Sequence, residues 1–370
     1  MKKITHFLSK LIYIILLIAI FIIIYIIIFS KINNLSIEDS LNYYKYLIYD
    51  IFNTDYTIGY DPNILNNTAT YTSDNISIHT VKNNYYYNQL DEYGKIIYNS
   101  IANNIENMKK NNFIIDFSTK FNSLLNEPSG QYKLNKSFQS ALDAFSYDNP
   151  EYFYINISNV SLSIKHSTFG IKTKYYVSIV PTNGKSYLYD KYALSLDSLN
   201  NDILAVENAK NKILNSITAT TDYDKLLAVH DILINSIDYT STDSNNDYNI
   251  YGALINKKVV CEGYSKAFKY IVDSLGIDCI LVCGSAINSD NSNSDGELHM
   301  WNYVLLNNKW YGIDVTWDDP IIINSKKKIL RHTYFCKGYK AFNESHFPNG
   351  KITDSGMMFT LPTLSNTNYK

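Results

Sequence analysis

The sequence predicts an α+β protein with one membrane-spanning helix near its N-terminus. Three observations lead to this fold class. An apolar run extends from Leu11 to Phe29, a helical pattern begins at Cys261, and two β-type segments at 299–306 and 309–317 are separated only by a pair of asparagines. The last two features together predict a helix that begins with a cysteine and, after it in the chain, an antiparallel β-hairpin.

The N-terminal run predicts an uncleaved membrane anchor over residues 1–31. The run is 19 residues long and lacks charge, Gly and Pro, so as a helix it spans about 28 Å. A cleaved signal peptide is the alternative, but its apolar region would be about 7–15 residues long with small residues before the cut. Lys2, Lys3 and Lys10 precede the run. This basic excess predicts a single-pass protein of the cell membrane with a cytoplasmic N-terminus and the rest outside the cell.

Residues 32–83 are predicted to form a stalk. Residues 36–52 can form one short helix, with Ser36 as its N-cap. Residues 53–80 are rich in Asn, Thr, Ser and Asp, so little regular structure is expected there.

Residues 84–217 are predicted to form an N-terminal α+β region. Apolar spacings of three and four indicate helices at 85–108, 137–145 and 194–217, and alternation indicates strands at 152–164 and 171–179. No residue of this region indicates chemistry.

Residues 218–370 contain the segments from which chemistry is expected. An amphipathic helix is predicted over 222–237, and a short element over 251–255. His230 lies beside apolar residues of that helix and is interpreted as a structural histidine. His332 and His346 are interpreted as surface or structural residues.

Cys261 opens the next helix, which Gly276 is expected to end. The positive end of the helix dipole favours the thiolate form of a cysteine, and a thiolate is the attacking species in nucleophilic catalysis. Cys279 and Cys283 lie on one predicted strand, too far apart to bridge, and are interpreted as buried core thiols.

The two β-type segments at 299–306 and 309–317 are predicted to form a hairpin that places His299 and Asp314 on one face. If Asn307 and Asn308 form a two-residue turn, residue 306 pairs with 309 and 301 with 314. His299 and Asp314 are then diagonal neighbours about 7–8 Å apart by Cα, so the carboxylate can orient the imidazole. Because side chains alternate between the two faces of a strand, Trp301 lies on the same face as His299. There it either lines the acyl site or supports the hairpin. Trp317 is predicted to point to the other side.

The segments VCEGYSKAF, LHMWNYV and WYGIDVTWDDP resemble the transglutaminase-like superfamily. The resemblance covers roughly residues 220–320, and more weakly 84–155. It implies a papain-like or transglutaminase-like core and a catalytic domain over 218–370. It also implies that Cys261 is the nucleophile, His299 the base and Asp314 the orienting carboxylate. The family includes transglutaminases, peptidases, deamidases and members without known activity, so the motif identifies the machinery and not the reaction.

The leading hypothesis is an extracytoplasmic thiol enzyme, a transglutaminase-like cysteine peptidase or acyltransferase acting on amide bonds. Hydrolysis is favoured because the neighbouring segment 284–297 is small and polar. A protein-crosslinking transglutaminase and a cell-envelope scaffold with a vestigial triad are the alternatives. The expected partners are a protein or peptide substrate, with cell-wall peptide as one case, and the membrane. A net charge of −2 argues against nucleic acid. No cofactor or metal is expected, since no CxxC or HExxH motif occurs.

Overall fold

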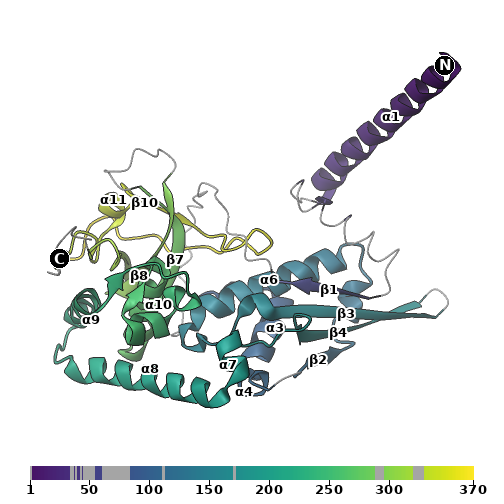
Figure 1. The fold of residues 1–370 in the computed structure, drawn as a ribbon. Coiled ribbons are helices and arrows are strands. Elements are labelled where there is room, and N and C mark those ends of the chain that lie inside the picture. Colours follow the sequence, from purple (N-terminus) through teal and green to yellow (C-terminus); the bar gives the residue numbers. More distant parts are fainter. Residues whose placement is uncertain are drawn as a thin grey trace. The chain divides into compact units, whose positions relative to one another are not determined.

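The computed structural model describes most of the chain (Figure 1). The chain forms two compact units. The described residues are 2–33, 37, 40–41, 44, 55–60, 84–110, 113–169, 172–287, 296–319 and 329–370. One unit comprises Met1–Ile58, Asp116–Asn135 and Leu162–Ser178, and the other Gly59–Ile115, Lys136–Ser161 and Ile179–Lys370. Each unit is described below by itself.

The first unit begins with helix α1 (Lys2–Asn33). Its segment Ile12–Ile32 is long and apolar enough to cross a membrane, and the most apolar part of this segment is not buried in the protein. A signal sequence has the same length and composition, so the helix indicates membrane anchoring or a signal sequence. The short helix expected over 36–52 lies largely outside the described residues.

A four-stranded sheet in the order β1-β3-β4-β2 accounts for much of the remaining first unit. Its strands are β1 (Asp55–Gly59), β2 (Ile115–Ser118), β3 (Val160–Phe169) and β4 (Lys172–Pro181), and the short helix α5 is Asn122–Leu125. The expectation of little structure over 53–80 is wrong at β1, because pairing with β3 stabilises a strand whose own pattern is weak. Residues 61–80 lie outside the described residues.

The helices that precede Cys261 differ from the predicted ones mainly in the residues at which they begin and end. The predicted 85–108 helix is interrupted near Asn103, which caps α3, and 137–145 is the middle of a longer helix. The strand expected from 152 begins at Val160, because turns that start at Pro150 and Ile157 precede it. The helices are α3 (Glu92–Ala102), α4 (Ile105–Met108), α6 (Gly130–Asp148), α7 (Asp190–Leu194) and α8 (Leu196–Ser216).

The core of the second unit is a helix packed on an antiparallel sheet, so the predicted α+β fold class is confirmed. Helix α9 (Asp222–Ser236) and the paired strands β5 (Asp238–Tyr239) and β6 (Lys258–Val259) precede helix α10 (Cys261–Ser274). Gly276 follows α10 with a φ of 85°, a left-handed conformation suited to glycine. The sheet has the order β10-β7-β8-β9 and consists of β7 (Cys279–Ala286), β8 (Glu297–Leu306), β9 (Lys309–Ile313) and β10 (His346–Asn349).

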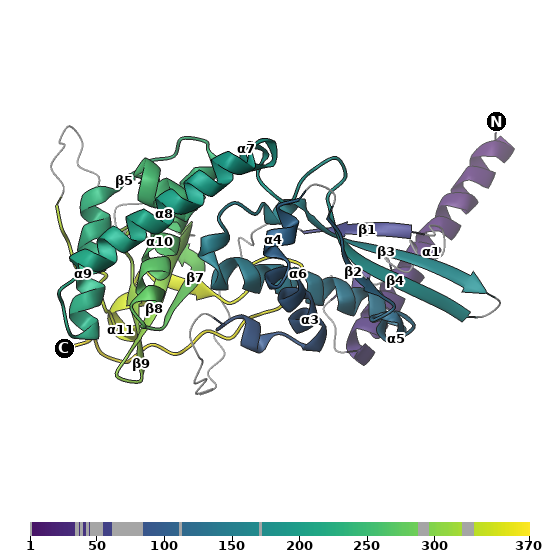
Figure 2. The same cartoon turned by 90° about the horizontal axis from the view of Figure 1, so that it is seen from below.

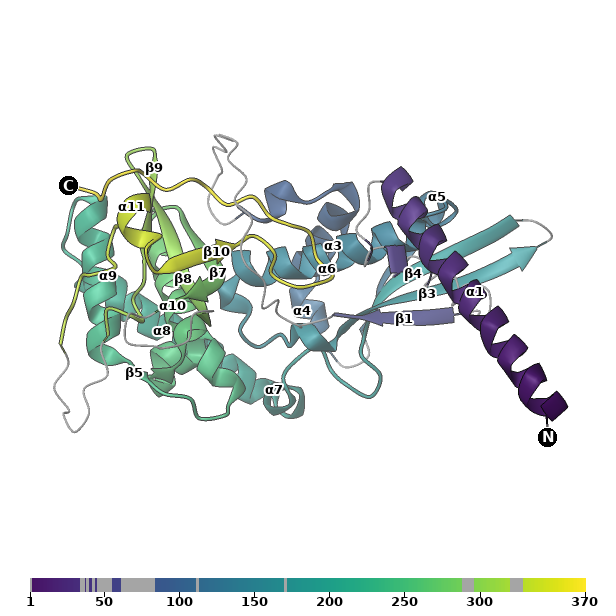
Figure 3. The same cartoon turned by 90° about the horizontal axis from the view of Figure 1, so that it is seen from above.

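Helix α10 contacts β7 and β8 on one side of this sheet, where α8 also lies (Figure 2). The short helix α11 (Tyr339–Phe342) and the C-terminal segment lie on the other side (Figure 3). All four cysteines are free, and Cys279 and Cys283 are buried as predicted.

The β8–β9 hairpin has the predicted register. Leu306 pairs with Lys309, and Asn307 and Asn308 have φ values of 49° and 60°, as a two-residue turn of this kind requires. The ladder continues to the pair Asn302–Ile313. Strand β9 ends there, so Asp314 lies immediately after the strand rather than within it.

Candidate active site

The loop before Cys261 fixes where helix α10 begins. The backbone N–H of Val260 donates to the Asp247 carbonyl (3.0 Å). The Asp247 carboxylate in turn accepts from the Thr242 hydroxyl (2.6 Å) and the Thr242 backbone N–H. Gly263 allows a close approach, since a Cβ there would lie 2.4 Å from Cβ of Val259. Cys261 is therefore held as the first residue of α10, with a partly exposed thiol at the positive end of the helix.

Hydrogen bonds from α10 bring the hairpin to the cysteine. The Tyr264 hydroxyl donates to Asp319 Oδ2 (2.6 Å), just after the hairpin. The Ser265 hydroxyl donates to the Met300 carbonyl (2.9 Å), and the Asn302 amide donates to the Ser265 carbonyl (3.0 Å). All of these polar groups belong to buried residues, so the bonds constrain β8 along the helix.

His299 and Asp314 form a buried hydrogen-bonded pair. Nε2 of His299 lies 2.7 Å from Oδ2 of Asp314, and the two residues are 7% and 1% exposed. The other Asp314 oxygen accepts from the backbone N–H groups of Thr316 (2.9 Å) and Trp317 (3.1 Å). These bonds orient the carboxylate toward the ring. Because Nε2 is engaged, Nδ1 is the nitrogen left to face Cys261.

The electrostatics of the pair favour a protonated imidazole. Burial alone lowers the pKa of His299, but the Asp314 charge, the bond to Asp314 and the interaction with Cys261 outweigh it and raise the pKa to about 10. Burial would raise the pKa of Asp314, yet the His299 charge and the bonds from His299 and His346 lower it below its ordinary value of 3.8.

His346 is a second histidine at the same carboxylate, and sequence reasoning missed it. Its Nε2 lies 3.0 Å from Asp314 Oδ2, and its Nδ1 lies 2.9 Å from the Ser345 hydroxyl. The ring is fully buried and stacks on Phe342. Sequence reasoning interprets His346 as a surface or structural residue; it is buried, and it bonds to the proposed catalytic carboxylate. It reaches this place because β10 pairs with β7, a contact between segments 60 residues apart that no local pattern signals.

The positions of the two tryptophans near the pair differ from those that strand alternation suggested. The prediction that Trp317 points away is wrong, because its ring stacks on His299 with centroids 5.1 Å apart. The chain turns after β9, so strand alternation does not extend to Trp317. Trp301 is fully buried against His346 and Phe342, and it is not among the residues that line the pocket at Cys261. Its position is that of a support for the hairpin.

A pocket of about 470 Å³ opens at Cys261 and His299. Residues from α10, β8 and the 239–249 loop line it, and Tyr239 is among them. A further wall comes from residues 145–158, between the end of α6 and the start of β3. Sequence reasoning assigned no chemistry to that segment, and no motif in it marks a pocket wall. The pocket can hold a peptide-sized group beside the thiol.

Donor atoms suited to a metal ion converge at two places in the described part of the chain. One is the group His299, Asp314 and His346, in which every residue is buried and both histidines bond to Asp314. The other is the group His230, Asp231 and His332, two of whose members reach the surface.

Residues 211–315 match the family model of the transglutaminase-like superfamily, so the predicted resemblance is confirmed over this segment. The chain is 29% identical over 105 residues to the kyphoscoliosis peptidase of Mus musculus, and 26% identical over 144 residues to that of Homo sapiens. These alignments cover 26% and 36% of the chain but only 16% and 22% of the two relatives. A crystal structure of a TGase superimposes with a TM-score of 0.27 and 17% identity, over 45% of this chain and 46% of that one.

Proposed function

We propose that the chain is a membrane-anchored thiol enzyme that cleaves amide bonds through a Cys261–His299–Asp314 triad. One observation carries the proposal: Cys261 and His299 line the same pocket, and His299 is hydrogen-bonded to the buried Asp314. A nucleophile, a base and an orienting carboxylate in this order are the parts that acyl transfer requires. The superfamily match over 211–315 includes all three residues.

In the proposed mechanism the Cys261 thiolate attacks the carbonyl carbon of an amide. The new C–S bond forms while the carbonyl electron pair moves to oxygen, where the backbone N–H groups at the start of α10 can stabilise the charge. The C–N bond then breaks, and Nδ1 of His299 gives its proton to the leaving amine. Water then attacks the thioester carbonyl, and His299 takes one of the water protons as the C–O bond forms. The C–S bond breaks with its electron pair returning to sulfur, so the free acid leaves and the Cys261 thiolate is restored.

Hydrolysis is the favoured outcome over crosslinking. The pocket wall combines polar side chains, such as those of Ser146, Asn149 and Asn245, with a larger number of aromatic and apolar ones, and Cys261 itself is partly exposed. The partial exposure of the thiol gives water access to a thioester formed there, whereas crosslinking requires that water be kept out.

The proposed organisation follows the predicted boundaries with one exception and one addition. Residues 1–31 anchor the chain with a cytoplasmic N-terminus, and 218–370 carry the triad outside the cell. The exception is the predicted stalk over 32–83, because residues 55–59 form β1 of the four-stranded sheet. The addition is that residues 145–158, from the region 84–217, form part of the substrate pocket. Outside the cell, the available substrates are proteins and peptides, including those of the cell wall.

The test offers the full-length chain in detergent a glutamine-containing peptide, with and without a labelled primary amine. Release of free acid that the amine does not suppress supports hydrolysis. Incorporation of amine faster than free acid or ammonia appears would instead establish the crosslinking reaction. If neither product forms with the native chain, the proposal fails and a scaffold role is favoured. If the products persist in Cys261→Ala, the assignment of Cys261 as the nucleophile fails.

A further inference from the structure

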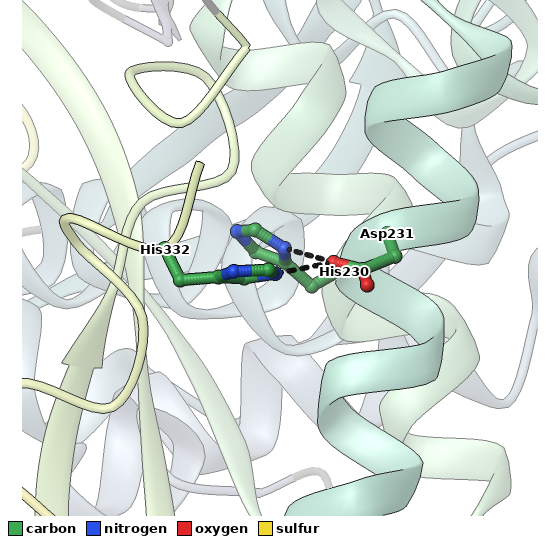
Figure 4. Close-up of side chains that lie close together, drawn as sticks. All are labelled: His230, Asp231 and His332. Atoms are coloured by element: carbon green, nitrogen blue, oxygen red, sulfur yellow. Dashed lines mark hydrogen bonds and ion pairs between the residues drawn. The ribbon is translucent and has the colours of Figure 1, made fainter. Parts of the chain in front are cut away.

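Two histidines and one aspartate, none of which belongs to the proposed catalytic pair, lie close together (Figure 4). His230 and Asp231 are neighbours on α9, and His332 comes from the segment after residue 329. Oδ1 of Asp231 lies 3.0 Å from Nδ1 of His230 and 2.8 Å from Nε2 of His332. All three atoms lie within 4.8 Å of one another, although His332 is 101 positions away from Asp231 in the sequence.

Two carboxylates lie against the ring of His230, an arrangement that attracts positive charge in the form of a second ring proton or a metal ion. The ring is fully buried, and Nε2 lies 3.2 Å from Oδ2 of Asp318, which is also fully buried. Each ring nitrogen therefore faces a carboxylate oxygen. A neutral imidazole has a single N–H, so one of these contacts lacks a proton unless the ring is charged or a cation lies beside it.

Asp318 is positioned to determine which ring nitrogen of His230 carries the proton. Both of its oxygens accept from the backbone N–H of Tyr334, at 3.1 Å each, which fixes the carboxylate. An N–H donated from His230 Nε2 to Asp318 leaves the Nδ1 lone pair directed at Asp231. A carboxylate behind one nitrogen and a free lone pair on the other is the usual arrangement of a histidine that binds a metal.

We propose that His230 Nδ1, Asp231 Oδ1 and His332 Nε2 form a binding site for a zinc-class divalent metal ion. Two imidazoles and one carboxylate suit zinc and its first-row neighbours, whereas Ca²⁺ and Mg²⁺ prefer oxygen ligands. Ligand atoms around tetrahedral zinc lie about 3.3 Å apart for bonds of about 2.0–2.1 Å. The two distances to Asp231 Oδ1, 3.0 Å and 2.8 Å, are a few tenths of an ångström shorter than this value, and the whole group lies within 4.8 Å.

The surroundings leave room for a fourth ligand. The side chains of Asp231 and His332 are 30% and 43% exposed, so the ion can enter from solvent and keep one water. The group His299, Asp314 and His346 lacks this opening, because its members are at most 7% exposed and His346 Nδ1 is bonded to Ser345.

A bound ion at this site braces the turn that carries the proposed catalytic carboxylate. It ties the His332 segment to α9, and through His230 it orders Asp318. The backbone N–H of Asp318 donates to the Asp314 carbonyl (3.3 Å), so the two sites share one turn. The role is structural, and it stands independently of the proposed reaction.

The test uses the full-length chain in detergent, stripped of metal by a chelator and titrated with Zn²⁺ against a chromophoric competitor. The native chain is expected to bind one zinc and to melt at a higher temperature when zinc is added. His332→Gln should raise the zinc Kd at least about 100-fold, because loss of an outer-shell partner alone costs about 10- to 100-fold. Asp318→Asn removes only such an outer-shell partner, so it should raise the zinc Kd by about 10- to 100-fold.

Two control variants distinguish this site from other side chains that could bind zinc. His166→Gln removes a histidine from β3, and Cys261→Ala removes the exposed thiol; both should bind zinc as the native chain does. Labelling of Cys261 by a thiol reagent should persist in His332→Gln, which keeps the metal result separate from the proposed reaction. Equal zinc affinity in the native chain and His332→Gln, or no saturable binding by the native chain, would overturn the proposal.

Discussion

His346 and His299 bind the same oxygen of Asp314 from two different strands. Their Nε2 atoms lie 3.0 Å and 2.7 Å from Oδ2. Burial is the main cause of the lowered pKa of His346, so this ring is neutral near pH 7 and donates its Nε2–H to the carboxylate. The Ser345 hydroxyl can then donate to Nδ1. We therefore expect His346 to position Asp314 without touching substrate.

The first prediction concerns this positioning role. His346→Gln should lower kcat by up to about 100-fold with little change in KM, because a small displacement of Asp314 misaligns His299. Asp314→Asn is the matched comparison and should cost about 10⁴-fold, since it removes the acceptor that sets the His299 tautomer. Steady-state kinetics on the same amide substrate measures both. A rise in KM alone for His346→Gln would contradict a positioning role.

A second prediction concerns stability against pH. The folded-state pKa of His299 is raised from 6.5 to about 10, so the folded state holds this proton more tightly than the unfolded state. The resulting stabilisation is complete below about pH 6.5 and is lost as the pH rises toward 10. The melting-temperature difference between the native chain and His299→Gln should therefore shrink from pH 6 to pH 10. A difference that stays constant or grows over this window would contradict the assigned shift.

The third prediction tests the hairpin register. One residue inserted between Asn307 and Asn308 should move Asp314 to the opposite face from His299, unless a bulge absorbs it. Activity should fall by orders of magnitude while circular dichroism stays close to native. An insertion after Gly184, in an exposed turn with a φ of 72°, is the control and should leave activity unchanged. Full activity of the hairpin insertion would show that the pairing is not needed.

The fourth prediction concerns membrane topology. Lys2, Lys3 and Lys10 precede the apolar helix, so the N-terminus should stay in the cytoplasm. Protease added to intact cells should remove everything beyond about Lys31, as followed by antibodies to tags at each end. A full-length chain that is protected from protease, or recovered in the soluble fraction, would contradict this orientation.

Local sequence patterns were sufficient to predict the helix that begins at Cys261 and the turn at Asn307 and Asn308. Their signals lie within a few residues: a stop glycine, apolar spacing, and a pair of residues that tolerate positive φ. The place of Trp317 was not predictable from parity, because the strand ends four residues earlier. His346 and the pocket wall at 145–158 depend on contacts between distant segments, which periodicity does not encode.

The most direct measurement of the central claim is labelling of the native full-length chain with a peptide-like thiol electrophile, followed by peptide mapping. The account predicts a single adduct on Cys261, with the buried Cys279, Cys283 and Cys336 serving as internal controls. It also predicts that labelling slows by about 100-fold or more in His299→Gln, because a positioned base contributes about 10²- to 10⁴-fold. Adducts spread over all four cysteines, or an unchanged rate in His299→Gln, would contradict the assignment of Cys261 as the activated nucleophile.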